Sequence, residues 1–271
     1  MPHPVAAIRG LSVRFGDVTA LDELDLTIQP GERVGLIGES GSGKSMTASA
    51  LLGLLPRNAT VTGSVQLRGI ELVGHPEKEL RRLRGDAVGL VAQDPRTALN
   101  PLVMVGHQVA EPLRAKGVKA AEARRRAVDL LAQVRLPDPE RLARRYPGAL
   151  SGGQRQRVGI AMALAADPAL LIADEPTSAL DTTVQAGVLA LLAELPPTSS
   201  LLFITHDIAV AALLCSRLVV LRRGVKVADG PTAEVTGNPP HEYVSELLLA
   251  SSSTALPDTC ESLNMLTRES A

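Results

Sequence analysis

Aromatic residues and excess positive charge are both scarce in this 271-residue chain, which has two Phe, two Tyr and no Trp. Few side chains are therefore available to stack on the bases of a single strand. The formal net charge is -1, so no overall basic field attracts a polyanion. Together these shortages argue against nucleic acid as a partner.

Cysteines and long apolar runs are scarce as well. Cys215 and Cys260 have neither a paired spacing nor a neighbouring His cluster, which predicts two reduced thiols and no disulfide, structural zinc or iron–sulfur cluster. Residues 1–4 lack the charged and then apolar pattern of a secretory signal, and charges or prolines interrupt every apolar run before it reaches membrane-spanning length. We therefore expect a soluble, cytoplasmic protein.

Glycine is concentrated in residues 38–45, which match the P-loop pattern G-x-x-x-x-G-K-[ST]. The apolar residues 34–37 precede the loop and the helix-like residues 46–55 follow it, as the motif requires. Backbone N–H groups in such a loop turn inward around phosphate oxygens, and the helix start adds its positive dipole end. The loop residues expected to bind the nucleotide in this way are Gly38, Glu39, Ser40, Gly41, Ser42 and Gly43. Lys44 would reach the β- and γ-phosphates and Ser45 would offer a hydroxyl to Mg²⁺. A turn that binds nothing is the alternative, and the full strand–loop–helix context disfavours it.

Two later apolar strands end in residues that suit phosphate chemistry. Residues 170–174 lead into Asp174 and Glu175, which we interpret as the acid beside Mg²⁺ and the candidate base for the attacking water. Residues 201–205 lead into His206, which is expected at the same edge of the sheet. A histidine in such a place is more often a capping or core residue, but proximity to phosphate would favour a functional role.

A second candidate anion site opens the helix predicted over residues 154–165. Its residues are Ser151, Gly152, Gly153 and Gln154. A Ser cap followed by two glycines leaves backbone N–H groups unshielded at a helix start. An ordinary capped helix explains the same pattern about equally well.

The hydrophobic pattern predicts an α/β fold. Short strands at residues 8–15, 24–28 and 63–69 form an antiparallel side sheet, and residues 101–146 are helical with Arg-rich, solvated faces. Further along the chain, helices alternate with apolar strands, which indicates a mainly parallel sheet covered on both faces. We expect one domain over residues 1–250 and a flexible tail over residues 251–271.

In these motifs the chain resembles the ATP-binding subunits of ABC transporters, from Ile8 to about Leu249. Residues 150–154 are similar to the family signature, Gln93 to the Q-loop glutamine, residues 178–181 to the D-loop, and His206 to the switch histidine. Phe15 falls where the family places an aromatic ring under adenine. The resemblance implies a P-loop ATPase with an inserted helical subdomain at about residues 95–165.

The resemblance also implies a mechanism and partners. ATP would be the substrate and Mg²⁺ the cofactor, held by Ser45, Gln93 and Asp174, while Glu175, His206 and Gln93 would take part in hydrolysis. Two such domains, identical or paralogous, would meet head to tail, so that Ser151–Gly153 of one closes on the γ-phosphate held by the other. Two transmembrane permease subunits would bind this pair at the cytoplasmic face of the membrane, and an extracytoplasmic solute-binding protein would act indirectly.

A narrower resemblance is to the subunits of peptide and nickel importers. It rests on residues 38–41, 93–95, 99–101, 105–106, 111–113 and 238–243. Ala92 and Gly148–Ala149 depart from the usual pattern without touching a phosphate ligand. Residues 93–113 are apolar enough to predict a docking surface for the membrane subunits. The cargo cannot be named from the sequence.

Two other classes of function are alternatives to a transporter ATPase, and the sequence disfavours both. A soluble ABC-type ATPase acting on DNA or ribosomes would carry long inserts or a second ATPase domain, and neither is present. A catalytically dead half would have lost Lys44, Glu175 or His206, and all three are present.

Overall fold

A computed structural model describes residues 3–178 and 180–252 of the chain, which divide into two compact units. The first unit runs to Arg81 and resumes at Pro196, and the second is Arg82–Leu195. The helix α2 (Glu77–Asp86) contains the point at which the chain first passes from one unit to the other.

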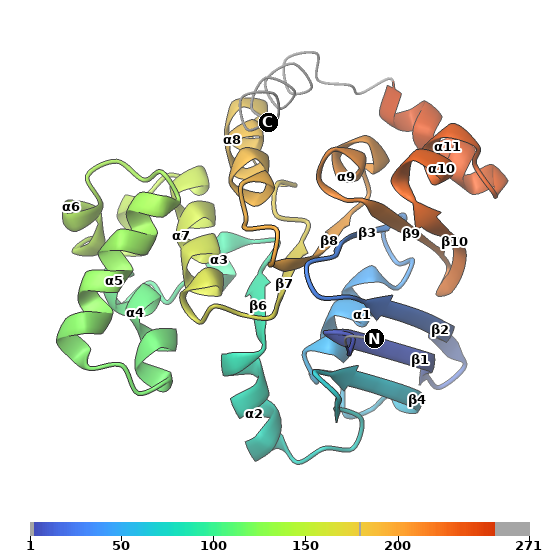
Figure 1. Cartoon of the computed structure of the whole chain (residues 1–271), viewed down its shortest axis with the longest axis horizontal. Helices are drawn as coiled ribbons and strands as arrows, with labels where there is room; N and C mark the ends of the chain where they lie inside the picture. The colour runs from blue at the N-terminus through green and yellow to red at the C-terminus, as the bar shows by residue number, and fades with distance from the viewer. Residues whose placement is uncertain (1–2, 179, 253–271) are drawn as a thin grey trace. The chain divides into compact units, whose positions relative to one another are not determined.

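The first unit contains an antiparallel sheet with the strand order β2-β1-β4-β5. Its strands are β1 (Ala6–Phe15), β2 (Val18–Ile28), β4 (Thr60–Leu67) and β5 (Ile70–Glu71). β1 pairs antiparallel with both β2 and β4, which confirms the predicted side sheet, and Figure 1 shows these three strands side by side. β2 begins six residues earlier than residue 24, because a tight turn at Gly16 lets pairing start at once between Phe15 and Val18.

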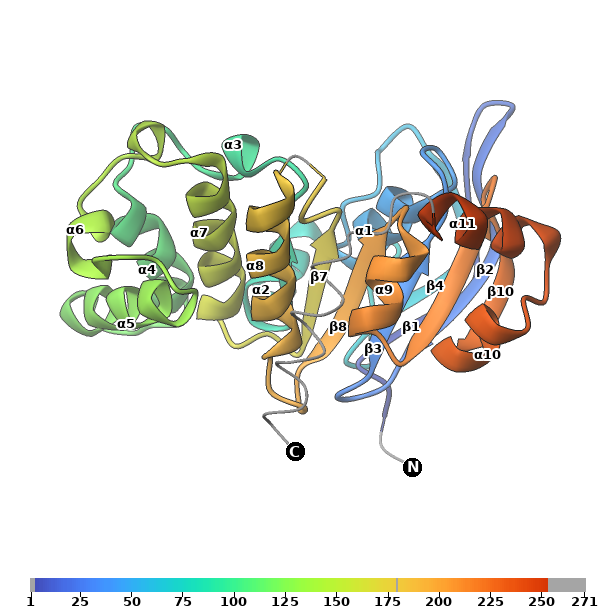
Figure 2. The same cartoon turned by 90° about the horizontal axis from the view of Figure 1, so that it is seen from above.

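The same unit holds a second group of strands, in which β3 (Arg33–Ile37) lies between β8 (Ser200–Thr205) and β9 (Arg217–Arg222). Both pairings of β3 are parallel, and β10 (Val225–Pro231) returns antiparallel to β9. Every residue of β8 is buried, as expected for a parallel strand covered on both faces. Helix α9 (Ile208–Leu214) packs on these strands (Figure 2), and α1 (Lys44–Leu51) contacts β2 and β4.

Helix α1 begins and ends earlier than the helix predicted over residues 46–55. It begins at Lys44, directly after the last loop glycine, and its C-cap is Leu52. Gly53 then adopts a φ of 61°, a left-handed conformation that ends helices and that glycine adopts at little cost.

Two helices near the end of the first unit were not predicted. α10 (Thr232–Gly237) contacts β10, and α11 (Glu242–Ser252) packs against α9. Residues 253–271, which include Cys260 and most of the expected tail, lie outside the described residues.

The second unit pairs β6 (Val88–Val91) with β7 (Leu170–Asp174) in parallel, and it also contains α-helices, of which the one at Gly152–Ala165 contacts β6. These helices are α3 (Pro95–Ala98), α4 (Val105–Ala115), α5 (Ala120–Gln133), α6 (Pro139–Ala143), α7 (Gly152–Ala165) and α8 (Thr182–Ala193). Helices α4, α5 and α7 pack on one another, and α6 packs against α4 and α5 (Figure 1).

The helical part of this unit follows the predicted pattern closely. Val105, Val109 and Leu113 are buried on one face of α4. The Arg-rich face of α5 is solvated, and Arg126 pairs there with Glu122 one turn earlier. In residues 3–178 and 180–252, no helix combines the length and the apolar character needed to cross a bilayer.

Candidate functional site

The glycine-rich loop, residues 38–43, joins the end of β3 to the start of α1. Gly43 has a φ of 108°, and a Cβ placed on it would lie 2.6 Å from Leu21 Cδ2 and 2.9 Å from the carbonyl oxygen of Ala20. Only glycine fits this combination of backbone angle and close neighbours. The sharp turn that the loop makes into the helix therefore depends on this residue.

Lys44 folds back over the loop that precedes it. Its side chain is buried, and Nζ donates hydrogen bonds to the carbonyl oxygens of Gly38 at 2.6 Å and Glu39 at 2.8 Å. The N-cap of α1 is Gly43, which supplies no side-chain cap to the first N–H groups of the helix. A buried ammonium beside an uncapped helix start makes this loop a site for an anion.

The loop is also held by two segments that lie far away in the sequence. The backbone N–H of Gly224, in the turn between β9 and β10, donates to the carbonyl oxygen of Ser42 at 3.0 Å. The backbone N–H of Glu39 donates to the hydroxyl of Tyr243 at 2.9 Å. Sequence analysis missed both contacts, and the only signal for Tyr243 was its place in the segment 238–243.

His206 lies at the edge of the sheet from which the glycine-rich loop leaves. β3 and β8 are parallel and in register, with Ile37 opposite Thr205, so Gly38 and His206 follow neighbouring strand ends. His206 is exposed. The first unit thus brings His206 and the loop together.

Phe15 belongs to the same unit, at the end of β1. It is half-buried and pairs with Val18 across the β1–β2 hairpin. The other strand of this hairpin contacts the loop, because Ala20 and Leu21 are the neighbours of Gly43.

The second unit holds the acidic residues and Gln93. β6 and β7 are parallel with Val91 opposite Ala173, so Gln93 and the pair Asp174–Glu175 leave the two strands at one edge. The amide Nε2 of Gln93 donates to Oε2 of Glu175 at 3.2 Å. Gln93 is therefore oriented by the carboxylate that the sequence marks as the candidate base.

Glu175 has an unusual backbone conformation for its residue type. Its φ is 43°, in the left-handed region that costs a residue with a Cβ about 1–2 kcal/mol. Such strain is found most often at functional sites. Asp94, which follows Gln93, caps α3: its carboxylate accepts a hydrogen bond from the backbone N–H of Arg96. This hydrogen bond lowers the pKa of Asp94.

Residues 151–154 form a reciprocal cap at the start of α7. Ser151 Oγ accepts from the backbone N–H of Gln154 at 3.2 Å, and the Gln154 side-chain oxygen accepts from the backbone N–H of Ser151 at 3.0 Å. The pattern S-x-x-Q is the sequence signal of this capping box, and sequence analysis did not use it. Helix α7 consequently begins at Gly152, two residues before the predicted start.

Gly153 also has a structural reason to be glycine. A Cβ placed on it would lie 2.3 Å from Cγ1 of Val184 in α8, so the two helices approach closely at this point. Ser151 and Gly152 remain exposed. Ala179, in the segment similar to a D-loop, lies outside the described residues, while Asp181 caps α8 by accepting from Val184 N–H at 2.9 Å.

Each unit, taken by itself, offers an oxygen group of the kind that Mg²⁺ prefers. Ser45 is exposed in the first turn of α1, and Asp174 is half-exposed at the end of β7. Within the described ranges, no group of three or more His, Cys, Asp or Glu side chains could hold a metal ion. Mg²⁺ is commonly bound by one or two carboxylates together with waters and substrate phosphates, so the Ser45 hydroxyl and the Asp174 carboxylate are each chemically suitable ligands.

Comparison with known proteins agrees with this geometry. Residues 21–178 match the family described as "ABC transporter". One relative is a Brucella melitensis protein that is provisionally named a peptide import ATP-binding protein. It is 44% identical over 91% of this chain and 77% of its own length. The Salmonella typhimurium oligopeptide transport ATP-binding protein OppD is 45% identical over 87% of this chain and 71% of its own length.

Solved structures give the same result. The dimeric ATP-binding cassette MJ0796, bound to ADP and Pi, superposes with a TM-score of 0.75 and 32% identity over 84% of this chain and 98% of its own. The protein cbiO1 of Clostridium perfringens, part of the ABC transporter complex cbiONQ, superposes with a TM-score of 0.74 and 26% identity over 94% of this chain and 96% of its own.

Proposed function

Since this chain belongs to the ABC transporter family, we propose that it is the ATP-hydrolysing subunit of a peptide importer. The observation that carries the proposal is the loop of residues 38–43 with Lys44 folded over it, because this arrangement presents a buried positive charge and a helix start to an anion. The chain hydrolyses ATP there. The names of its relatives support peptides as cargo, and a metal chelate such as one of nickel is the second candidate.

The proposal assigns a role to each site residue. The loop and Lys44 hold the phosphates of ATP, and Phe15 packs under the adenine. Ser45, Gln93 and Asp174 would hold Mg²⁺, which when bound would neutralise charge that develops on the phosphate oxygens. Glu175 orients and deprotonates the attacking water, and His206 contacts the γ-phosphate.

We further infer that hydrolysis requires a second ATPase subunit, either an identical copy or a paralogue. The signature-like residues Ser151, Gly152, Gly153 and Gln154 of one subunit would face the γ-phosphate bound by the other. Two observations support this: Ser151 and Gly152 are exposed, and the related cassette MJ0796 is dimeric. The capping box would hold this helix start rigid against the partner's nucleotide.

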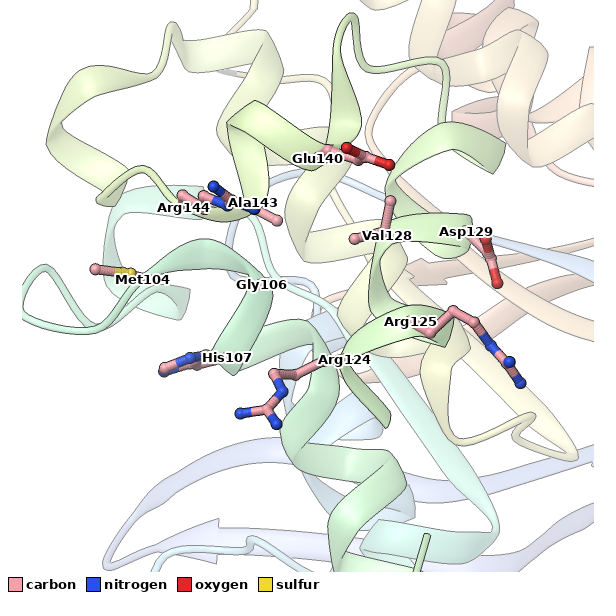
Figure 3. Close-up of a pocket in the computed structure, with 10 residues that line it drawn as sticks. All are labelled: Met104, Gly106, His107, Arg124, Arg125, Val128, Asp129, Glu140, Ala143 and Arg144. Carbon is pink, nitrogen blue, oxygen red and sulfur yellow. The ribbon is translucent and has the colours of Figure 1, made fainter. Parts of the chain in front are cut away.

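A pocket in the second unit supports docking of the membrane subunits. It has a volume of about 460 Å³ and lies among α4, α5 and α6 (Figure 3). Its lining includes Met104, His107, Arg124, Val128, Glu140 and Arg144. In the adjoining loop Leu102 is 83% exposed, so its side chain is accessible to a partner that binds beside the pocket. This surface overlaps the predicted docking stretch 93–113, and binding there would keep the chain at the cytoplasmic face of the membrane.

The substitution Lys44→Ala tests the ATPase proposal. We expect hydrolysis to be lost and ATP binding to weaken, because the charge that offsets the β- and γ-phosphates is removed. Lys78→Ala is the matched control, since Lys78 is an exposed lysine on α2. Near-normal turnover of Lys44→Ala, assembled with its partners, would contradict the assignment.

Cross-linking tests the docking surface. A photoreactive group at Leu102 in the assembled transporter is expected to reach a membrane chain, whereas the same group at Leu54, which is 51% exposed in the other unit, is not. If Leu102 cross-links only to ATPase subunits, the membrane subunits dock elsewhere.

A further inference from the structure

Helix α11 reaches the phosphate-binding loop through one side chain, that of Tyr243. Its ring is buried with 1% of its surface exposed, and its hydroxyl accepts the hydrogen bond from the Glu39 backbone N–H at 2.9 Å. The two residues are 204 positions apart in the sequence. The contact therefore ties the start of the last described helix to the loop that follows β3.

The peptide group that Tyr243 holds is the same one that Lys44 holds. The N–H of Glu39 and the carbonyl of Gly38 belong to one planar peptide unit, and the two groups point in opposite directions. Tyr243 accepts from the N–H, while Lys44 Nζ donates to the carbonyl oxygen at 2.6 Å. If the N–H is fixed, the direction of the carbonyl is fixed too. The carbonyl oxygen of Gly38, an acceptor that positions the ammonium, is then also fixed.

Tyr243 is itself held from several sides. The guanidinium of Arg222, at the end of β9, lies 4.8 Å from the centre of the ring. The backbone N–H of Tyr243 donates to Nδ1 of His241 at 3.0 Å, which fixes the first turn of α11. Burial raises the pKa of Tyr243 against the opposing effect of the Glu39 amide, so the hydroxyl stays protonated at neutral pH.

We propose that Tyr243 is a positioning residue of the nucleotide site, which sets the orientation of the 38–39 peptide and thereby the place of the Lys44 ammonium. The inference rests on the proposed function, because it assumes that this loop binds the phosphates of ATP. It makes the docking of α11 a determinant of ATP affinity.

The substitution Tyr243→Phe isolates the hydroxyl. The ring, its burial and its contact with Arg222 remain, but the Glu39 N–H loses its acceptor. We expect the dissociation constant for a fluorescent ATP analogue and the KM for ATP to rise about three- to tenfold, the range for losing one hydrogen bond. The turnover at saturating ATP should change less than twofold, because bound phosphate restores the loop.

The matched control is Tyr146→Phe. Tyr146 is the other tyrosine of the chain, it is 48% exposed and it belongs to the other unit. This variant loses a hydroxyl without loss of a contact to the loop, so its ATP affinity should equal that of the wild type. Thermal unfolding of all variants, with and without ATP and Mg²⁺, separates an effect on the site from an effect on the fold.

Each outcome of these measurements either supports or overturns the positioning role of Tyr243. A weaker ATP affinity in Tyr243→Phe with a smaller ATP-induced rise in melting temperature supports the positioning role. A lower melting temperature with unchanged ATP affinity overturns it, and so does a fall in turnover with unchanged KM. If Lys44→Ala loses ATP binding while Tyr243→Phe matches the wild type, only this inference fails. If Lys44→Ala binds ATP normally, the proposed function fails instead.

Discussion

Replacing Glu175 by glutamine tests the chemical step most directly. The side chain follows β7 and accepts a hydrogen bond from the Gln93 amide at 3.2 Å. Glutamine has the same shape and keeps an oxygen that can accept this bond. The substitution therefore removes the negative charge and the basicity of the side chain, and little else.

The expected effects on stability and on rate differ widely in size. The Gln93–Glu175 hydrogen bond is exposed, so changing its acceptor from carboxylate to amide should alter the free energy of unfolding by about 0.5 kcal/mol or less. Removing a positioned base slows a reaction by about 10²–10⁴-fold, which corresponds to roughly 2.7–5.4 kcal/mol in the barrier. A loss of hydrolysis of this size could not come from unfolding.

The assay measures the rate of ATP hydrolysis. It also measures the molecular size of the protein, with and without ATP and Mg²⁺. Glu175→Gln should bind ATP normally, hydrolyse it at the reduced rate and accumulate as an ATP-dependent dimer with a copy or a paralogue. Glu194→Gln is the control, because it removes one charge from an exposed pair with Arg135 in the same unit.

Two results would refute this reasoning in different places. Normal hydrolysis by Glu175→Gln would show that Glu175 is not the base. An inactive variant that stays monomeric with ATP bound, in the presence of its proper partner, would contradict the shared site between two subunits.

Two further predictions concern the first unit. Burial raises the pKa of Cys215 to about 12, so at pH 8 we expect iodoacetamide to label Cys215 only after denaturation, and rapid labelling of the native chain in peptide mapping would contradict this. Burial acts to raise the pKa of Asp229, but hydrogen bonds from Arg217 and Lys226 outweigh it and the pKa is lowered from 3.8. The carboxylate therefore contributes stability above pH 3.8 that is lost as pH falls through the lower folded value. Asp229→Asn should cost about 1–2 kcal/mol of unfolding free energy at pH 7, and chemical denaturation should show this difference shrinking below pH 3.8.

The local parts of this structure were readable from the sequence because their causes are local. The strand Leu170–Asp174 follows from a short run of apolar residues, and it is found where the pattern predicts it. The end of α1 was wrong by four residues, since the left-handed conformation of Gly53 outweighs the apolar residues that follow it.

The contacts that hold the candidate site could not be read in this way. The first turn of helix α11 is fixed by the side chain of His241 rather than by a standard cap residue. The bond between Tyr243 and Glu39 joins positions that no periodicity relates. The capping box of Ser151 and Gln154 differs from these contacts, because the local pattern S-x-x-Q is enough to predict it.

The division of residues between the two units suggests how affinity and turnover are separated in this protein. The residues assigned to holding the phosphates within a single subunit, the loop with Lys44 and its support from Tyr243, all belong to the first unit. The residues assigned to the water and to Mg²⁺, apart from Ser45, belong to the second. Substitutions such as Tyr243→Phe should therefore act mainly on the dissociation constant for ATP, whereas Glu175→Gln should act mainly on the rate of hydrolysis. An ATP dissociation constant that rises tenfold in Glu175→Gln would show that the second unit contributes to ground-state binding and that the two tasks are not separated in this way.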